Sequence, residues 1–171
     1  MKKSVAIGIA LLLLVLAPIA YFAKNKIAEK AIESQTGADV DIDSNGEEIT
    51  IKTEDGQTQY SAGGDVKSPD GFPQELVVMG DAKLILSSTS GTGSSLTYLT
   101  KSDQAAVFAK YLEKIVELGW KKEMELNSGE GKMLNISKGS ASAVITIGEN
   151  STDDTSFKTT VSIIYTSDTD K

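Results

Sequence analysis

Residues 157–165 read FKTTVSIIY, and this stretch decides the fold. Every second residue from Phe157 to Tyr165 is apolar, aromatic or Thr, whereas Lys158, Thr160 and Ser162 lie between them. Successive side chains of a β-strand point to opposite faces, so this alternation is typical of a strand with one face on a core. It predicts a sheet that is covered on one side.

Working outward from this strand, the sequence contains five further strand-like runs. They span residues 82–88, 94–100, 120–126, 132–138 and 141–147. Between the second and third runs, Ser102 and Asp103 are suitable helix caps, and Gly119 is a suitable helix end. The apolar positions between them recur at helical spacing: Ala105, Phe108, Ala109, Leu112, Ile115 and Val116. The predicted order is ββαββββ, an α+β fold in which one helix covers a mostly antiparallel sheet.

Residues 38–62 also alternate with period two and are predicted to form a three-stranded β-meander. Asn45-Gly46 and Asp55-Gly56 supply the residues that tight hairpin turns favour. The stretch from Gly63 to Gly71, which contains Pro69, is typical of a linker. The predicted domains here are a meander over 37–65 and an α+β domain over 66–171.

The N-terminus is strongly apolar. Residues 5–23 read VAIGIALLLLVLAPIAYFA, a run of 19 residues without charge. As a helix this run extends about 28 Å, close to the hydrocarbon thickness of a bilayer. Pro18 and Tyr21 are poorly placed for signal cleavage, which favours a retained transmembrane anchor over a cleaved signal peptide. Residues 1–23 are therefore predicted to contact membrane lipid, and residues 24–36 to form a helical stalk.

Composition excludes several kinds of chemistry. The chain has no Cys and no His, and all 17 of its cationic side chains are Lys. Thiolate nucleophiles, disulfides, zinc fingers and Ser-His-Asp triads are thereby excluded, and no cofactor is expected.

Residues 37–171 carry 12 Lys against 22 Asp and Glu, a balance of 12 − 22 = −10. Such a domain is expected to face outward from the membrane and to bind no nucleic acid.

One motif resembles part of a metal site. Asp41, Asp43 and Asn45 have the spacing of the first half of a calcium loop, and Glu47 could add an oxygen. The second half fails, because the twelfth position is Lys52 rather than a bidentate Glu. We therefore expect no metal site and interpret these aspartates as the solvent face of a strand, with weak calcium binding as the alternative.

The sequence contains no catalytic motif. Glu123 and Glu125 are predicted to lie on one strand face, where they could mimic a pair of catalytic carboxylates, but neighbouring lysines favour a solvated surface. The glycines around Gly91 and Gly129 lack the spacing of a phosphate-binding loop and indicate hairpin turns. Trp120 is interpreted as a core residue, with a ligand-stacking ring as the alternative. No residue receives a catalytic role, and the chain is predicted not to be an enzyme.

Several short segments together resemble a known group of proteins. They are Phe72-Pro73-Gln74-Glu75-Leu76, Gly80-Asp81-Ala82-Lys83 entering a strand, and Phe108, Tyr111, Leu112 and Gly119-Trp120. Over about residues 39–165 the chain resembles a recurring domain of uncharacterised bacterial envelope proteins, many of them lipoproteins or membrane-anchored. The resemblance implies an extracytoplasmic domain without established activity. This chain differs from the lipoproteins because it has no Cys to carry a lipid.

The combined expectation is a single-pass protein of the cell membrane whose C-terminal domain lies outside the cytoplasm. Signal cleavage would instead make it secreted or periplasmic. We expect a non-enzymatic binding or interaction module of the cell envelope, with an envelope protein as a partner. The first alternative is a pilin-like or secretion-apparatus subunit, because an apolar N-terminal helix leading to a sheet is the pilin plan. A hydrolase that uses Ser and Lys or carboxylates is the second alternative.

Overall fold

A computed structural model of the chain describes residues 39–42, 48–53, 56–62, 66–91, 93–129 and 131–167. The chain divides into two compact units, residues 1–62 and 63–171. The predicted membrane anchor at 5–23 and the stalk at 24–36 lie outside the described residues. Within the described ranges, no helix combines the length and the apolarity needed to cross a membrane.

The first unit contains three antiparallel strands: β1 (Asp39–Ile42), β2 (Glu48–Thr53) and β3 (Gly56–Ala62). Thr50 of β2 pairs with Asp41 of β1 and with Gln59 of β3, so β2 lies between the other two. These strands form the predicted meander.

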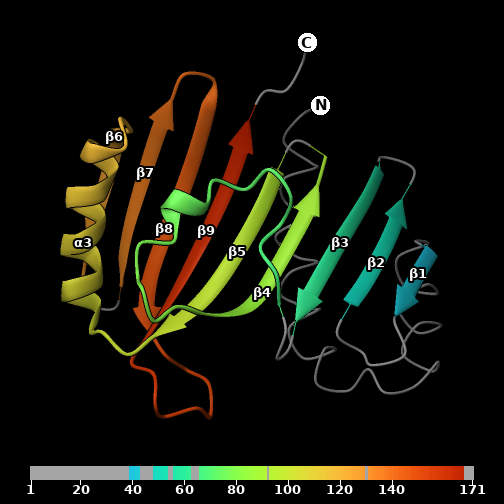
Figure 1. Ribbon diagram of the computed structural model, residues 1–171, viewed down its shortest axis with the longest axis horizontal. Helices are drawn as coiled ribbons and strands as arrows, with labels where there is room; N and C mark the ends of the chain where they lie inside the picture. Colours follow the sequence, from blue (N-terminus) through green and yellow to red (C-terminus); the bar gives the residue numbers. More distant parts are fainter. Residues whose placement is uncertain are drawn as a thin grey trace. The chain divides into compact units, whose positions relative to one another are not determined.

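The second unit confirms the α+β class and the order ββαββββ. Its elements are the 3₁₀ turn η1 (Gln74–Leu76), β4 (Lys83–Ser90), β5 (Gly93–Thr100), α3 (Gln104–Glu117), β6 (Lys121–Asn127), β7 (Lys132–Lys138), β8 (Ala141–Glu149) and β9 (Thr159–Ser167). The strands lie in the order β4-β5-β9-β8-β7-β6, and all neighbours are antiparallel (Figure 1).

Strand β9 lies in the middle of this sheet, between β5 and β8. Its alternation is as predicted, since Thr159, Val161 and Ile163 are all fully buried. The strand begins at Thr159 rather than at Phe157. The reason is local: the Phe157 amide donates to the carbonyl of Asp154 and so belongs to the preceding turn.

The predicted glycine-rich turns join neighbouring strands. Gly91 follows β4 directly and has φ +53°, which favours glycine. Between β6 and β7, the Ser128 amide donates to the Gly131 carbonyl at 3.0 Å. Both segments therefore serve as hairpin connections.

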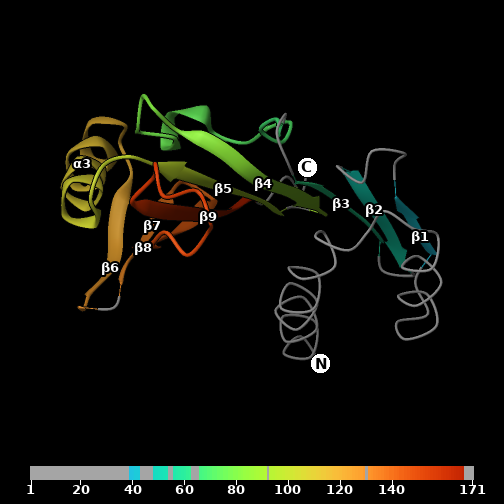
Figure 2. The same ribbon diagram turned by 90° about the horizontal axis from the view of Figure 1, so that it is seen from below.

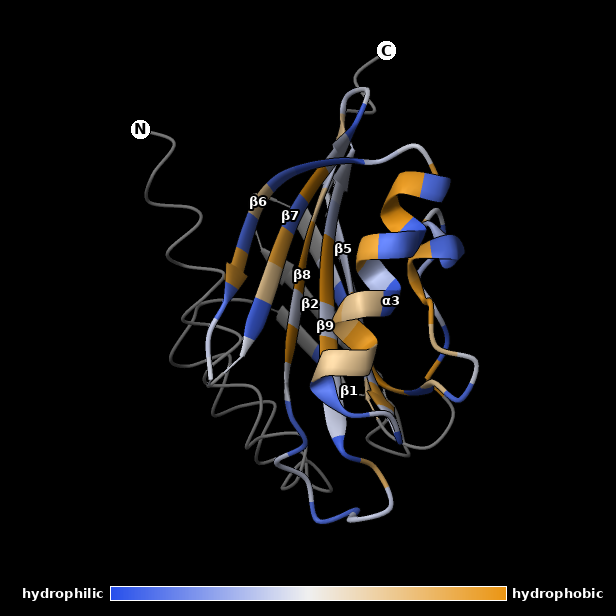
Figure 3. Ribbon diagram, turned by 90° about the vertical axis from the view of Figure 1, so that its left-hand side faces the viewer, coloured by the Kyte–Doolittle hydropathy of each residue, from blue (hydrophilic) through white to orange (hydrophobic). Residues whose placement is uncertain are grey.

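Two elements cover the same face of the sheet. Helix α3 packs against β6, β7 and β8. Residues 66–80, which we call the strap, cross in front of the sheet beside the helix and carry η1 (Figures 1 and 2). Seen from the side, the apolar part of α3 faces the sheet (Figure 3). The core between the covers and the sheet comprises Phe72, Leu76, Leu96, Tyr98, Val107, Phe108, Tyr111, Ile115, Trp120, Leu134, Ile136, Ala143, Ile145, Ile147, Val161 and Ile163.

Helix α3 has the predicted ends but a rotated buried face. The Asp103 side chain accepts from the Ala106 amide at 2.9 Å, and Gly119 with φ +75° turns the chain out of the helix. The buried residues of the helix are Val107, Phe108, Tyr111 and Ile115. Ala105, Ala109 and Val116, which belong to the predicted apolar stripe, are exposed. The predicted stripe leaves out Val107 and Tyr111, so its centre lies on a different part of the helix surface from the buried face.

Candidate functional site

The best candidate site is the interior between α3, the strap and the sheet. Tyr98 on β5 and Tyr111 on α3 lie in it, and both side chains are fully buried. Their hydroxyl oxygens lie 2.9 Å apart, and the Tyr111 hydroxyl donates to the Leu76 carbonyl of the strap at 2.8 Å. Because a carbonyl only accepts, Tyr98 must donate to Tyr111. The two phenols therefore form a directed chain of hydrogen bonds that ends on the strap.

Burial governs the acid–base behaviour of these phenols. It raises the pKa of Tyr98 to about 12. Burial also raises the pKa of Tyr111 well above its usual value, and the neighbouring Tyr98 adds to the rise. Both phenols are protonated at neutral pH, so they serve as hydrogen-bond donors rather than as nucleophiles or bases.

Trp120 follows the end of α3 and belongs to the same core. Its buried ring meets the ring of Tyr165 edge-on at 6.5 Å, and Tyr165 in turn meets Phe72 of the strap at 6.2 Å. The Nζ atom of Lys138 lies 5.9 Å from the centroid of the Trp120 ring. Among the buried side-chain polar atoms of the described residues, Nε1 of Trp120 alone has no hydrogen-bond partner. Trp120 is thus a core residue whose indole N–H is a donor without an acceptor.

A clamp of hydrogen bonds closes the end of the site where α3 begins. The Asp81 carboxylate accepts from the Thr100 hydroxyl at 2.6 Å and from the Lys101 amide at 2.9 Å. These two donors, the Thr100 hydroxyl first, lower the pKa of Asp81. Thr159 donates to the carbonyl of Ser102 at 2.7 Å. The clamp joins the chain before β4, the end of β5 and the start of β9, and it fixes the point from which α3 begins.

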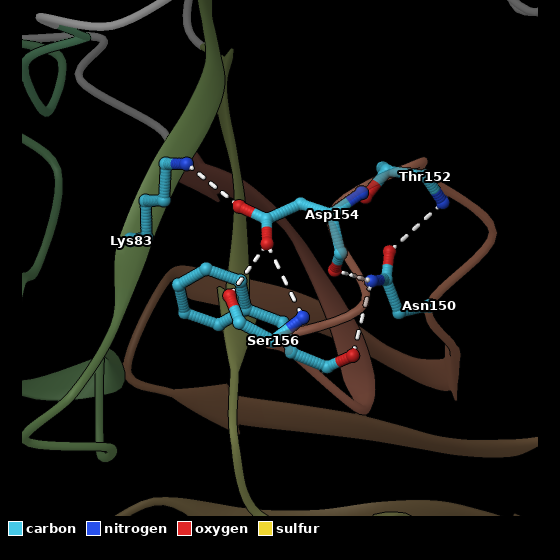
Figure 4. Close-up of polar contacts among 6 residues, drawn as sticks. Lys83, Asn150, Thr152, Asp154 and Ser156 are labelled. Atoms are coloured by element: carbon cyan, nitrogen blue, oxygen red, sulfur yellow. Dashed lines mark hydrogen bonds and ion pairs between the residues drawn. The ribbon is translucent and has the colours of Figure 1, made fainter.

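The loop between β8 and β9 contains a second polar cluster (Figure 4). Asp154 accepts from Lys83 Nζ at 3.1 Å and from both the amide and the hydroxyl of Ser156. The Nδ2 group of Asn150 donates to the Asp154 carbonyl at 2.9 Å, and Oδ1 of Asn150 accepts from the Thr152 amide at 2.9 Å. These groups satisfy one another within the loop and with β4, so the cluster braces the loop.

The carboxylates of β6 are not a pair. A β-bulge between Lys122 and Met124 makes Glu123 the extra residue, and Glu125 pairs with inward-facing Leu134. Glu123 instead accepts from the Ser137 hydroxyl at 2.6 Å, on the other face. The prediction of one shared strand face is therefore wrong, because the bulge changes the alternation. Each carboxylate also has a lysine of its own on β6.

The structure describes the candidate calcium loop at few of its residues. Asp41 is exposed and lies in β1 opposite Thr50. Asp43, Asn45 and Glu47 lie outside the described residues, so calcium binding stays an alternative. In the described part of the chain, no three Asp and Glu side chains gather as metal ligands would.

Most of the interior site has no clear signal in the sequence. Alternation identifies Tyr98 only as a strand residue, and composition predicts a linker for part of the strap. A signal for Tyr111 does exist, because it lies three residues after Phe108 and four before Ile115, on one helical face. No local pattern indicates that Leu76 meets Tyr111, since 35 positions separate them.

The fold and the site together define an α+β protein in which one helix and a strap enclose an apolar interior that contains hydrogen-bond donors. A family model described as START domain-like matches residues 78–168, more than half of the chain. The chain belongs to the START domain-like family. No curated protein and no solved structure matches it at a significant level.

Proposed function

We propose that this chain is a membrane-anchored, extracytoplasmic binding module of the cell envelope, without enzymatic activity, that takes up an apolar small molecule between α3 and the sheet. Its family supports binding, since START domain-like proteins generally bind ligands. The matched residues 78–168 include α3 and the strands β4 to β9 that enclose the interior.

The observation that carries this proposal is the buried Trp120 indole N–H without an acceptor. A buried donor left without a partner costs about 1–3 kcal/mol, and native proteins retain few of them. A ligand oxygen that accepts from Nε1 would recover that cost. The Trp120 ring packs edge-on against Tyr165, and Tyr165 packs edge-on against Phe72, so the indole belongs to an aromatic part of the core. Apolar walls with a few fixed polar groups are the usual composition of a small-molecule site.

The geometry gives a hydrolase no comparable support. Burial holds the Tyr98 and Tyr111 phenols in their protonated form. The carboxylates of Glu123 and Glu125 are exposed, and each forms an ion pair with a lysine. A catalytic acid or base usually lies in a concave site that excludes water, whereas these two carboxylates are exposed on an edge strand.

The binding proposal is tested with benzophenone, which is an apolar ketone and a photochemical crosslinker. The full chain in lipid nanodiscs is irradiated with increasing benzophenone, and the labelled tryptic peptides are identified by mass spectrometry. We expect saturable labelling of residues 115–121, the peptide that carries the chain's only tryptophan. Labelling that rises without saturation, or that is confined to residues 1–36, would contradict binding beneath α3.

The membrane proposal rests on the apolar run at 5–23 and is tested separately. We expect the full-length chain to stay in the membrane fraction after carbonate washing. In intact cells or spheroplasts, added protease should digest residues 37–171. Recovery of uncut chain in the aqueous fraction would contradict the anchor, and protection of the C-terminal domain would contradict its outward orientation.

A further inference from the structure

The strap is held to the domain differently from the strands. Its backbone hydrogen bonds are internal: the Phe72 amide donates to Pro69, and the Leu76 amide donates to Pro73. Among the described residues, no backbone hydrogen bond joins residues 66–80 to a strand or to α3. Lifting the strap therefore breaks no ladder of backbone hydrogen bonds.

Side chains make the attachment instead. Phe72 and Leu76 are buried in the common core, and Val77, Val78 and Met79 pack against it. The Tyr111 hydroxyl donates to the Leu76 carbonyl at 2.8 Å and so joins the helix to the strap. The Asp81 clamp fixes the chain directly after the strap. The strap is thus fixed at one end by hydrogen bonds. Its buried side chains Phe72 and Leu76, which we call the plug, fill part of the interior.

Leu76 combines two features that a ligand of this interior would need. Its side chain is fully buried against apolar neighbours, and its carbonyl oxygen accepts a hydrogen bond from the Tyr111 hydroxyl. We propose that Leu76 occupies the position of the ligand while no ligand is bound. An apolar molecule with an acceptor oxygen then binds by displacing the strap and accepting a hydrogen bond from the Tyr111 hydroxyl. This inference rests on the proposed function, because it concerns the same site.

The donors define the chemistry of that molecule. Once the strap is displaced, the Tyr111 hydroxyl and the Trp120 indole N–H are both hydrogen-bond donors without an acceptor. Burial raises the pKa of both tyrosines, so the interior disfavours negative charge. A neutral ketone, ester or amide fits these donors better than a carboxylate does. Residues 66–77 precede the family match, so the plug lies outside the matched region.

Displacement can be measured because the chain has no cysteine of its own. Spin labels at Glu75→Cys in the strap and Ala109→Cys in α3 both occupy exposed positions. Benzophenone at a concentration that saturates labelling of residues 115–121 should lengthen the distance between the labels. An unchanged distance at that concentration overturns the displacement. Absence of saturable labelling overturns the proposed function itself, so the two failures are distinguishable.

One substitution tests the plug directly. Leu76→Ala shortens the buried side chain and should raise benzophenone affinity severalfold. Leu99→Ala is the matched control, since Leu99 is 2 % exposed but lies outside the core cluster, and it should leave the affinity unchanged. Equal effects of the two substitutions would overturn the plug.

A second substitution tests the donor and serves if Leu76→Ala does not fold. Diphenylmethane has the same two rings as benzophenone without the oxygen, so it competes for the site without accepting a hydrogen bond. The wild-type chain should prefer benzophenone over diphenylmethane, and Tyr111→Phe should lower that preference by about threefold to tenfold, the value of the one hydrogen bond that Tyr111 contributes, while the bond from Trp120 remains. A preference that is unchanged in Tyr111→Phe would overturn the assignment of the donor to Tyr111.

Discussion

The hydroxyls of Tyr98 and Tyr111 lie 2.9 Å apart in the middle of the core, and both side chains are fully buried. The contact joins β5 to α3, and Tyr111 continues it to the Leu76 carbonyl of the strap. Sheet, helix and strap are therefore linked through one pair of phenols. A fully buried hydroxyl needs a partner, so the two side chains satisfy each other's requirement.

Removal of either hydroxyl should destabilise the domain, but by different amounts. Tyr98→Phe removes one donor and leaves the bond from Tyr111 to Leu76 intact, at a cost of about 1 kcal/mol. Tyr111→Phe leaves both the Tyr98 hydroxyl and the Leu76 carbonyl without that partner, at a cost of about 2 kcal/mol. Urea unfolding of the single and double variants measures these costs. The double variant should lose less than the sum, and strict additivity would contradict a coupled pair.

Alkaline pH should weaken the fold through the same phenols. The pKa of Tyr98 is about 12 in the folded chain and 10.0 in its ordinary state, so the unfolded chain releases its proton first. The stabilisation is complete below pH 10.0 and is progressively lost as the pH rises toward 12. Unfolding measured across this range should show a shallower decline in the Tyr98→Phe and Tyr111→Phe double variant. An equal decline in both proteins would contradict the assignment.

The sheet was predictable because its signals are local. Alternation identifies β9, and turn glycines such as Gly91 and Gly139, which both adopt positive φ, separate neighbouring strands. Asp103 is the predicted cap of α3 and accepts the expected amide. Each of these features depends on residues a few positions apart.

The site was not predictable, because it depends on contacts between distant residues. Leu76 has no periodic neighbours that indicate burial, and Tyr111 becomes its partner only once the strap and α3 have packed. The bulge at Glu123 likewise has no mark in the sequence of β6, yet it separates two carboxylates that alternation alone places together. Contacts between residues far apart in the sequence thus determine the site, and the periodicity of single segments does not indicate these contacts.

Two adjacent residues of α3 test the corrected helix face. Ile115 is 1 % exposed and Val116 is 73 % exposed. Ile115→Ala should therefore cost about 2–5 kcal/mol through the cavity it leaves. Val116→Ala should change stability by about 0.5 kcal/mol or less, because a surface change touches no core contact. Thermal or urea unfolding of both variants measures these costs. If both substitutions were costly, the result would support the predicted face, on which both residues belong to the core.

Acid should loosen the anchor of the strap at Asp81. Because the folded chain lowers the pKa of Asp81 below 3.8, its contribution to stability is present above that pH and is lost as the pH falls through the folded value. Asp81→Asn keeps one acceptor oxygen but cannot accept fully from both Thr100 and Lys101. We expect a cost of about 1 kcal/mol at neutral pH, modest because the side chain is exposed and screened by solvent. In urea unfolding, the difference between variant and wild type should shrink as the pH falls below 3.8. A difference that stays constant from neutral pH into that range would show that the charge of Asp81 does not hold the clamp.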